Sequence, residues 1–222
     1  MDCSEIFYAE ETECLKELIC DIGRRMWQRN YVDGNGGNIS MRLNENMVLC
    51  TPTYISKGFM KPEDMCMVDM QGRQLAGERS STSEIKTHLA IMRQNPMALA
   101  CVHAHPPYTT SFALCGRLPM GGVVSEAEIF LGELGLAPYG RPGSKELEEA
   151  VAALALGRNA IIMQGHGAIT WGKSAEEAYW KMENLEAYCQ VVHLAECRKD
   201  TLIPFSEEER KDLKRLREKF DQ

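Results

Sequence analysis

The sequence predicts one α/β domain of the α+β type, in which a central antiparallel or mixed sheet is covered by helices. Most strand-like segments follow one another across short polar turns, as in hairpins, whereas a doubly wound parallel sheet needs a helix between successive strands. The chain has 222 residues, of which 44% are hydrophobic. It is therefore long enough for one sizeable core, and no linker or low-complexity stretch divides it.

The first half of the chain is expected to hold one long helix and three strands. Residues 7–30 predict an amphipathic helix, because their apolar positions recur every three or four residues: Leu15, Leu18, Ile19, Ile22, Met26 and Trp27. A glycine-rich turn at 33–37 ends this helix. Strands are expected at 38–42 and 46–50, as a hairpin, and around 65–69.

The second half mixes helices and strands in the same way. We expect, in chain order, a helix over 83–94, a strand over 98–103, a short helix from Pro106 and Pro107 to residue 112, paired strands over 159–163 and 168–171, and a helix over 174–198. The charged residues 199–222 are expected to form a solvated helix or tail beyond a core of about residues 7–198. Residues 1–222 are assigned to a single domain.

The composition argues against several classes of partner and location. The formal net charge is −7, so the chain lacks the concentrated basic surface that a nucleic acid or an anionic membrane requires. The acidic N-terminus does not resemble a signal peptide, and no stretch is apolar enough to span a bilayer, so we expect a cytoplasmic protein. The nine cysteines form no Cys-x-x-Cys pair and no nucleophile motif, which indicates reduced thiols used mostly in packing.

The pair His103 and His105 is the most informative feature for function. Two residues at i and i+2 on an extended backbone project to the same side, so their imidazoles form half of a metal site. A first-row cation held mainly by neutral histidines is most often zinc. With one further ligand a coordination position stays open for substrate, as in catalytic sites.

His166 is the natural third ligand among the five histidines. Its neighbours Gly165 and Gly167 have no side chains to crowd a metal, although such a motif can also be a plain tight turn. His88 and His193 lie within predicted helices and are expected to be packing or surface residues.

Glu84 has two interpretations. Ser81 followed by Glu84 fits a helix capping box, and helical spacing alone favours that reading. In the functional reading, Glu84 is the general base beside a metal-bound substrate, because a carboxylate can have its pKa tuned towards neutrality.

Two polar loops could hold an anion. The turn at Gly36, Gly37 and Asn38 offers unscreened backbone amides, and Thr82 and Ser83 precede a predicted helix, whose N-terminus favours phosphate. The glycine turn is no dinucleotide fingerprint, since it lacks the third glycine and a preceding strand. Taken singly, each loop could also be only a turn.

Together these residues resemble the class II aldolase/adducin family, in particular its L-fuculose-1-phosphate aldolases. The resemblance spans roughly residues 10–198 and rests on six motifs in order: Gly36-Gly37-Asn38 followed by Ser40, Thr51-Pro52-Thr53, Ser83-Glu84 followed by His88, the histidine run 102–107, the run 137–143, and Gly165-His166-Gly167. It implies a mainly antiparallel sheet with helices on its faces. It also implies a homotetramer with active sites near subunit interfaces.

The resemblance assigns roles residue by residue. His103, His105 and His166 would bind one zinc ion per subunit, or another divalent transition metal, and Glu84 would be the acid/base residue and a resting-state fourth ligand. The phosphate pocket would comprise Gly37, Asn38, Thr53, Thr82 and Ser83. The implied reaction is zinc-dependent cleavage of a ketose or deoxyketose 1-phosphate to dihydroxyacetone phosphate and an aldehyde, with the metal acting as Lewis acid.

Two departures and several alternatives accompany this resemblance. Tyr54 stands where the family usually has a phosphate-contacting glycine, so the anion could sit differently, with help from Lys57. The segment 121–136 lacks a counterpart of the tyrosine that a neighbouring subunit supplies in fuculose-phosphate aldolases.

Several alternative functions stay open. Glu84 argues against a 4-epimerase, because the epimerase pattern has an aspartate at this position, whereas decarboxylases and dehydratases of the same family keep the glutamate. An adducin-like assembly module would lack the metal ligands, and a zinc hydrolase would use Glu84 to activate water.

Overall fold

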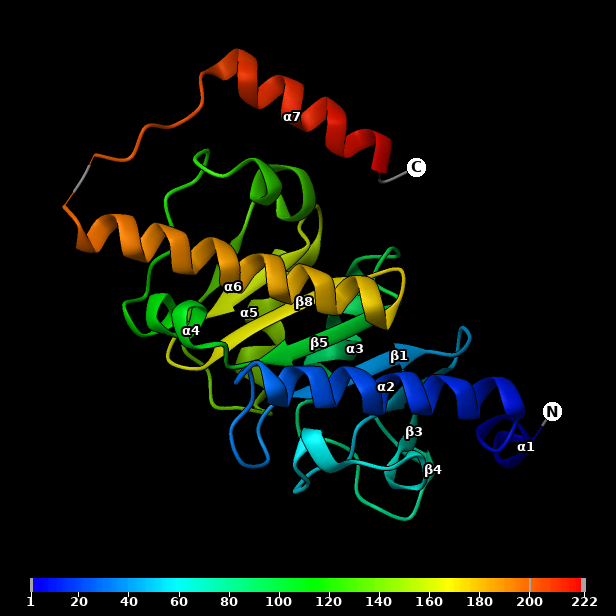
Figure 1. Ribbon diagram of the computed structural model, residues 1–222. Helices are drawn as coiled ribbons and strands as arrows, with labels where there is room; N and C mark the ends of the chain where they lie inside the picture. The colour runs from blue at the N-terminus through cyan, green and yellow to red at the C-terminus, as the bar shows by residue number, and fades with distance from the viewer. Residues whose placement is uncertain (1, 200, 221–222) are drawn as a thin grey trace.

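An eight-stranded sheet forms the middle of the fold in the computed structural model, which describes residues 2–199 and 201–220 (Figure 1). Its spatial order is β4-β3-β2-β1-β5-β8-β7-β6, and only the β6–β7 pair is parallel. The mainly antiparallel sheet of one domain is therefore confirmed. The strands are β1 (Asn38–Arg42), β2 (Met47–Cys50), β3 (Cys66–Asp69), β4 (Gln74–Ala76), β5 (Ala100–Ala104), β6 (Gly135–Ala137), β7 (Ala160–Met163) and β8 (Gly167–Gly172).

Helices cover both faces of the sheet (Figure 1). One face packs against α2 (Glu10–Gln28), α4 (Pro107–Leu114) and α6 (Ala175–Cys197), and the other against α3 (Ile85–Gln94) and α5 (Lys145–Ala155). Neighbouring residues of β5 contribute to both faces: Val102 packs in the hydrophobic cluster under α2, α4 and α6, and Cys101 in the cluster under α3 and α5. A central strand that is buried on both faces therefore has few polar residues in its sequence.

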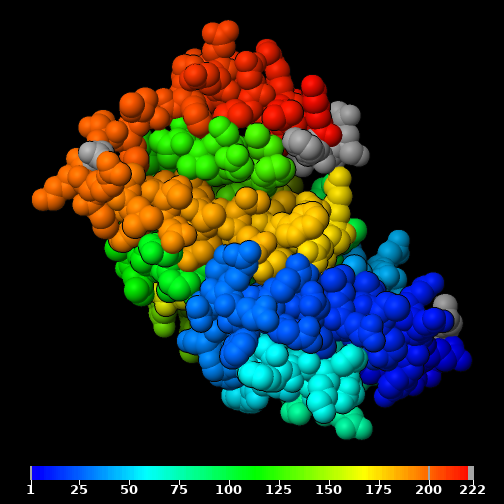
Figure 2. Space-filling model, viewed as in Figure 1, coloured from blue at the N-terminus to red at the C-terminus, as the bar shows by residue number. Residues whose placement is uncertain are grey.

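The first and the last helix contact different parts of the fold, α1 (Cys3–Phe7) against β4 and α7 (Glu207–Phe220) against the turn Ala127–Leu131. Short α1 precedes α2, and the extended backbone of Ala9 separates the two, so the predicted helix over 7–30 begins later than expected. The charged α7, orange to red in Figure 2, lies against the π-helical turn Ala127–Leu131. Arg210 of α7 is paired with Glu128 of this turn. In the described part of the chain, no helix has the length and apolar character needed to cross a bilayer.

Several short elements were not predicted. The strands β4 and β6 have three residues each, which is too short for an alternating pattern to show. Helix α5 was also not predicted, although its sequence indicates a helix: Ser144 is a typical N-cap residue, and Leu147, Val151 and Ala155 recur at a spacing of four. In the structure the Ser144 hydroxyl accepts the Leu147 N–H.

His88 is a packing residue, as expected, and is fully buried on α3, where its Nδ1 lies 2.7 Å from the Ser40 hydroxyl of β1. Burial lowers the pKa of His88 to about 4. The folded protein therefore keeps this imidazole neutral at pH values where the unfolded chain protonates it.

We expect the free energy of unfolding to fall as the pH drops from about 6.5 towards 4, because the unfolded chain then binds a proton that folded His88 does not. The contribution reaches about 3 kcal/mol at pH 4. Urea unfolding of the wild type and His88→Gln at several pH values measures it. An identical pH dependence in the two proteins would contradict this assignment.

Candidate metal centre and active site

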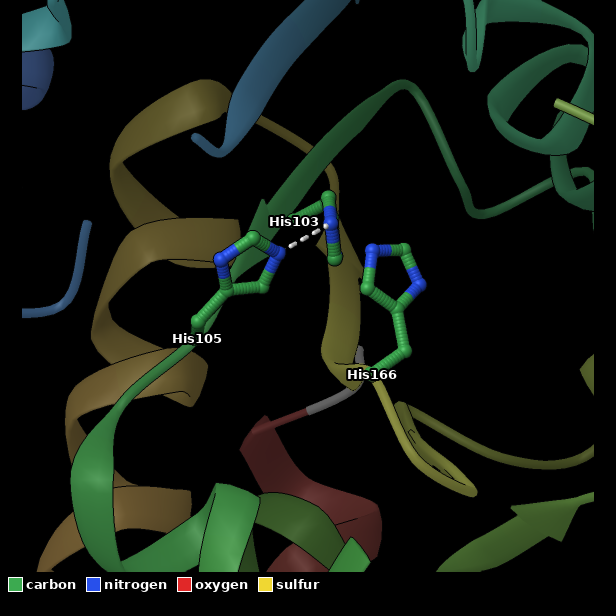
Figure 3. A group of neighbouring side chains, drawn as sticks. All are labelled: His103, His105 and His166. Carbon is green, nitrogen blue, oxygen red and sulfur yellow. Dashed lines mark hydrogen bonds between the residues drawn. The ribbon is translucent and has the colours of Figure 1, made fainter. Parts of the chain in front are cut away.

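Three histidine side chains converge at one end of β5 and β8. His103 lies in β5, His105 follows its end, and His166 lies in the turn that leads into β8. One nitrogen from each ring lies within 4.8 Å of the others, and the ring centroids are 4.6–5.0 Å apart (Figure 3). The structure thus brings together the ligands proposed from sequence.

The hydrogen bonds of two of these rings define their tautomers. Nδ1 of His103 donates to the Ala168 carbonyl at 2.9 Å, and Nδ1 of His105 donates to Oδ1 of Asp33 at 3.2 Å. In the neutral rings, both Nε2 atoms therefore carry lone pairs. These two atoms face each other at 3.1 Å (Figure 3), an arrangement that repels unless a cation lies between them.

The 3.1 Å between the Nε2 atoms of His103 and His105 fits a first-row metal. Two nitrogens on a tetrahedral zinc ion lie about 3.3 Å apart, given bonds of about 2.05 Å. Burial and the neighbouring imidazoles lower the pKa of His103, and burial lowers that of His166. Both rings are therefore neutral at pH 7, which is the form that binds a metal.

Gly167 allows the close approach of His105. A Cβ at residue 167 would lie 2.4 Å from the Ala104 carbonyl oxygen and 2.8 Å from Cδ2 of His105. Since neither distance is tolerable, any side chain here would push the imidazole or the β5 backbone away. This is the physical reason for glycine beside His166.

Glu84 is the N-cap residue of α3, but its carboxylate lies next to the histidines and makes no capping hydrogen bond. Its Oε2 is 3.4 Å from Nε2 of His103, and its Oε1 is 3.7 Å from Nε2 of His166. The helix begins at Ile85 without a side-chain cap, so the capping-box interpretation is wrong. The carboxylate instead accepts a hydrogen bond from Asn38, and the backbone N–H of Ser81 bonds to Gln74.

The loops proposed to bind phosphate meet beside Glu84. The backbone N–H of Thr82 donates to the Thr51 carbonyl at 3.1 Å, and that of Thr53 donates to the Ser80 carbonyl at 3.0 Å. The exposed Ser83 follows Thr82 directly. These bonds hold the loop after β2 alongside the loop before α3.

Gly37 directly precedes β1, and Asn38 is the first residue of that strand. Gly37 has φ +71°, and a Cβ there would meet a side-chain carbon of Val32 at 2.5 Å and the His103 carbonyl at 3.0 Å. Only glycine allows the turn to pass so close to β5.

Tyr54 and Lys57, the two residues that the sequence connected with an altered anion position, lie near these loops. Tyr54 has the left-handed φ of +56° and a side chain that is 84% exposed, so it adopts the backbone conformation that glycine adopts most easily. Lys57 is buried, and its amine donates to the carbonyls of Asn35 and Ile55. Burial lowers the pKa of Lys57 to about 8. In the described structure its amine is thus bonded to backbone carbonyls.

Sequence reasoning missed Asp33, which orients His105. Its carboxylate accepts the Nδ1 proton of His105, and this bond lowers the pKa of Asp33. Carboxylates commonly orient metal-binding histidines in this way. The sequence places Asp33 in the turn before β1, but it gives no sign of the contact with His105, because the two residues are 72 apart in sequence.

A pocket opens beside His105 on the side of Asp33. Its volume is about 550 Å³. Its wall comprises Asn30, Val32, Asp33, His105, Pro107, Thr110, Ser111 and Leu114. None of these described residues is a lysine or an arginine.

The chain belongs to the family defined by the class II aldolase and adducin N-terminal domain, whose model matches residues 17–193. It is 38% identical over 180 residues to an L-fuculose phosphate aldolase of Methanococcus vannielii, covering 81% of this chain and 96% of that one. It is also 34% identical over 175 residues to a 3-oxo-tetronate 4-phosphate decarboxylase of Haemophilus influenzae, with 77% and 83% covered.

The fold agrees with this membership. A solved L-fuculose 1-phosphate aldolase superposes with a TM-score of 0.85 at 25% identity, covering 94% of this chain and 97% of that structure. The family is therefore that of enzymes such as aldolases and decarboxylases. The particular reaction has to be argued from the residues of this chain.

We expect His166→Ala to weaken binding of zinc at least about 100-fold, because the substitution removes one of three converging nitrogens. His193→Ala is the matched control, since His193 lies on α6 and bonds to Cys197. Metal content after dialysis against a zinc buffer measures the effect. Equal zinc content in the wild type and His166→Ala would rule out this centre.

Proposed function

We propose that this protein is a zinc-dependent aldolase that cleaves a ketose or deoxyketose 1-phosphate to dihydroxyacetone phosphate and an aldehyde. The observation that supports it best is the placement of one carboxylate, Glu84, within 3.4–3.7 Å of two converging imidazoles. When bound, the cation would act as a Lewis acid towards the carbonyl and hydroxyl oxygens of the substrate.

Each part of the site has a role in this reaction. The loops at Gly37, Thr53, Thr82 and Ser83 bind the phosphate through backbone and hydroxyl groups. Cleavage passes the proton of the C4 hydroxyl to the Glu84 carboxylate, breaks the C3–C4 bond and moves its electron pair towards the carbonyl oxygen at C2. Glu84 then delivers this proton to C3 and is a carboxylate again.

A decarboxylase is the second candidate, because similarity to one is nearly as high. A 3-oxo-tetronate 4-phosphate is a β-keto acid, so loss of carbon dioxide breaks the equivalent bond and leaves the same three-carbon product. In the aldol cleavage the departing group is an aldehyde, which forms when the C4 hydroxyl loses its proton, whereas in the decarboxylation it is carbon dioxide, which leaves from a carboxylate without such a proton. The departing group therefore decides between them.

The pocket beside His105 favours an aldehyde as departing group. Asp33 contributes a negative charge, and none of the described wall residues offers a lysine or arginine to hold a carboxylate. The hydroxyl groups of Thr110 and Ser111 suit a short hydroxylated aldehyde instead. A carboxylate in this pocket would be repelled by Asp33.

The proposal includes a homotetramer with the active site near a subunit interface. Two aromatic side chains beside the site support it, since Tyr54 is 84% and Tyr139 is 67% exposed in the single chain. Exposed aromatic residues of this kind are typical of interfaces.

The test is an assay of zinc-loaded enzyme on ketose 1-phosphates and on 3-oxo-tetronate 4-phosphate, with separate detection of aldehyde and carbon dioxide. Dihydroxyacetone phosphate alone is not diagnostic, because both reactions yield it. We expect aldehyde release, condensation of dihydroxyacetone phosphate with an aldehyde in reverse, and a loss in kcat of about 10²–10⁴-fold for Glu84→Gln. Carbon dioxide release without any condensation would refute the aldolase.

A further inference from the structure

Lys57 links two of the loops that are proposed to bind phosphate. Its Nζ donates to the Asn35 carbonyl at 3.0 Å and to the Ile55 carbonyl at 2.7 Å. Asn35 belongs to the glycine turn before β1, and Ile55 lies two residues after Thr53 in the loop that follows β2. The amine is therefore within hydrogen-bond distance of both loops.

The positive charge of this amine has no partner of opposite sign. Lys57 is 1% exposed, and no carboxylate of the described residues forms an ion pair with it. Both of its hydrogen bonds go to neutral carbonyl groups. Because a buried charge without a counter-charge is costly, Lys57 would stabilise an anion that binds close to it.

The loops have the complementary deficit. The resemblance assigns the phosphate to Gly37, Asn38, Thr53, Thr82 and Ser83, and none of these residues is basic. The net charge of −7 gives no general attraction for an anion. A phosphate dianion at these loops therefore needs a local positive charge, and the buried ammonium group that is bonded to two of the loops can supply it.

The charge of Lys57 also interacts with the carboxylate beside these loops. Burial lowers the pKa of Lys57 to about 8, and the Glu84 carboxylate acts in the opposite direction by raising it. Asp33 of the glycine turn and the charged side chains of α2 do not contribute. Since Ser83 directly precedes Glu84, an anion bound at Ser83 would raise the pKa of Lys57 in the same sense.

We propose that the ammonium group of Lys57 is the counter-charge of the substrate phosphate and stabilises it through its electrostatic field, across the two loops that it links. This inference rests on the proposed function, which places the phosphate at these loops. The alternative role for Lys57 is a purely structural link that ties the loops together. The two roles differ in one property, because a structural link needs a hydrogen-bond donor and a counter-charge needs a charge.

The experiment compares Lys57→Gln and Lys57→Met with the wild type and with Lys61→Gln, a control on a lysine whose side chain is 72% exposed. Glutamine lacks the charge but keeps an amide that can donate to the carbonyls, whereas methionine lacks both. Calorimetry of inorganic sulfate binding to the zinc-loaded protein is the main readout. Sulfate has the tetrahedral shape of phosphate and stays a dianion throughout the neutral range. Urea unfolding shows that each variant is folded.

We expect Lys57→Gln and Lys57→Met to weaken sulfate binding to the same extent at pH 7, by about 10- to 100-fold, because both remove the same charge. The KM for a ketose 1-phosphate should rise by a similar factor, while zinc content stays unchanged. Lys61→Gln should bind sulfate as the wild type does. If Lys57→Met does not fold, the comparison of Lys57→Gln with the wild type decides.

Proton uptake is a second readout, which a structural link would not change. At pH 8 about half of the Lys57 amines are charged in the free protein, because this pH matches the pKa. A bound dianion favours the charged form, so sulfate binding should take up about half a proton. Calorimetry in buffers of different ionisation enthalpy measures this uptake, and the Lys57 variants should lack it.

The inference is overturned if Lys57→Gln binds sulfate as tightly as the wild type, whether or not Lys57→Met does, since a neutral donor would then suffice. A wild type that binds no sulfate, or that binds it without proton uptake at pH 8, overturns it as well. By contrast, sulfate binding that depends on the charge of Lys57, in a protein that cleaves no ketose phosphate, would refute only the proposed function. The two failures are therefore distinguishable.

Discussion

The position of β5 between β1 and β8 is the constraint on which the site depends. Pairing with β1 places Asn38 opposite His103, and pairing with β8 places Ala168 opposite Ala104 and the turn of His166 beside His105. Both pairings are antiparallel, and every residue of β5 and β8 is buried. A slip of one residue in either pairing would turn His103 to the other face of the sheet.

The site combines groups that are costly to bring together without a ligand. Three imidazoles converge, the unprotonated Nε2 atoms of His103 and His105 face each other, and burial keeps His103 neutral. Two of these rings are oriented from behind, by a carbonyl and by Asp33. Such an arrangement lowers the cost of binding a cation, because the ligands are already placed and deprotonated.

The sequence alone was informative where local pattern determines structure. The spacing of His103 and His105 showed that they share a face, and the polar turns predicted the hairpins. The sequence was ambiguous about the role of Glu84, because helical spacing favoured a capping box with Ser81, and the structure contains no such capping box. The deciding interaction is the Asn38 hydrogen bond, which joins residues 46 apart and leaves no local pattern. The link between Asp33 and His105 was invisible for the same reason, whereas α5 could have been found from Ser144 and the apolar spacing that follows it.

The central claim is that His103, His105 and His166 bind one catalytic cation. X-ray absorption at the zinc edge of the zinc-loaded protein tests it most directly, because it reports the type and distance of the ligand atoms. The account predicts three imidazole nitrogens at about 2.0–2.1 Å and one or two oxygens. Sulfur at about 2.3 Å, or a shell of oxygen without imidazole scattering, would contradict it.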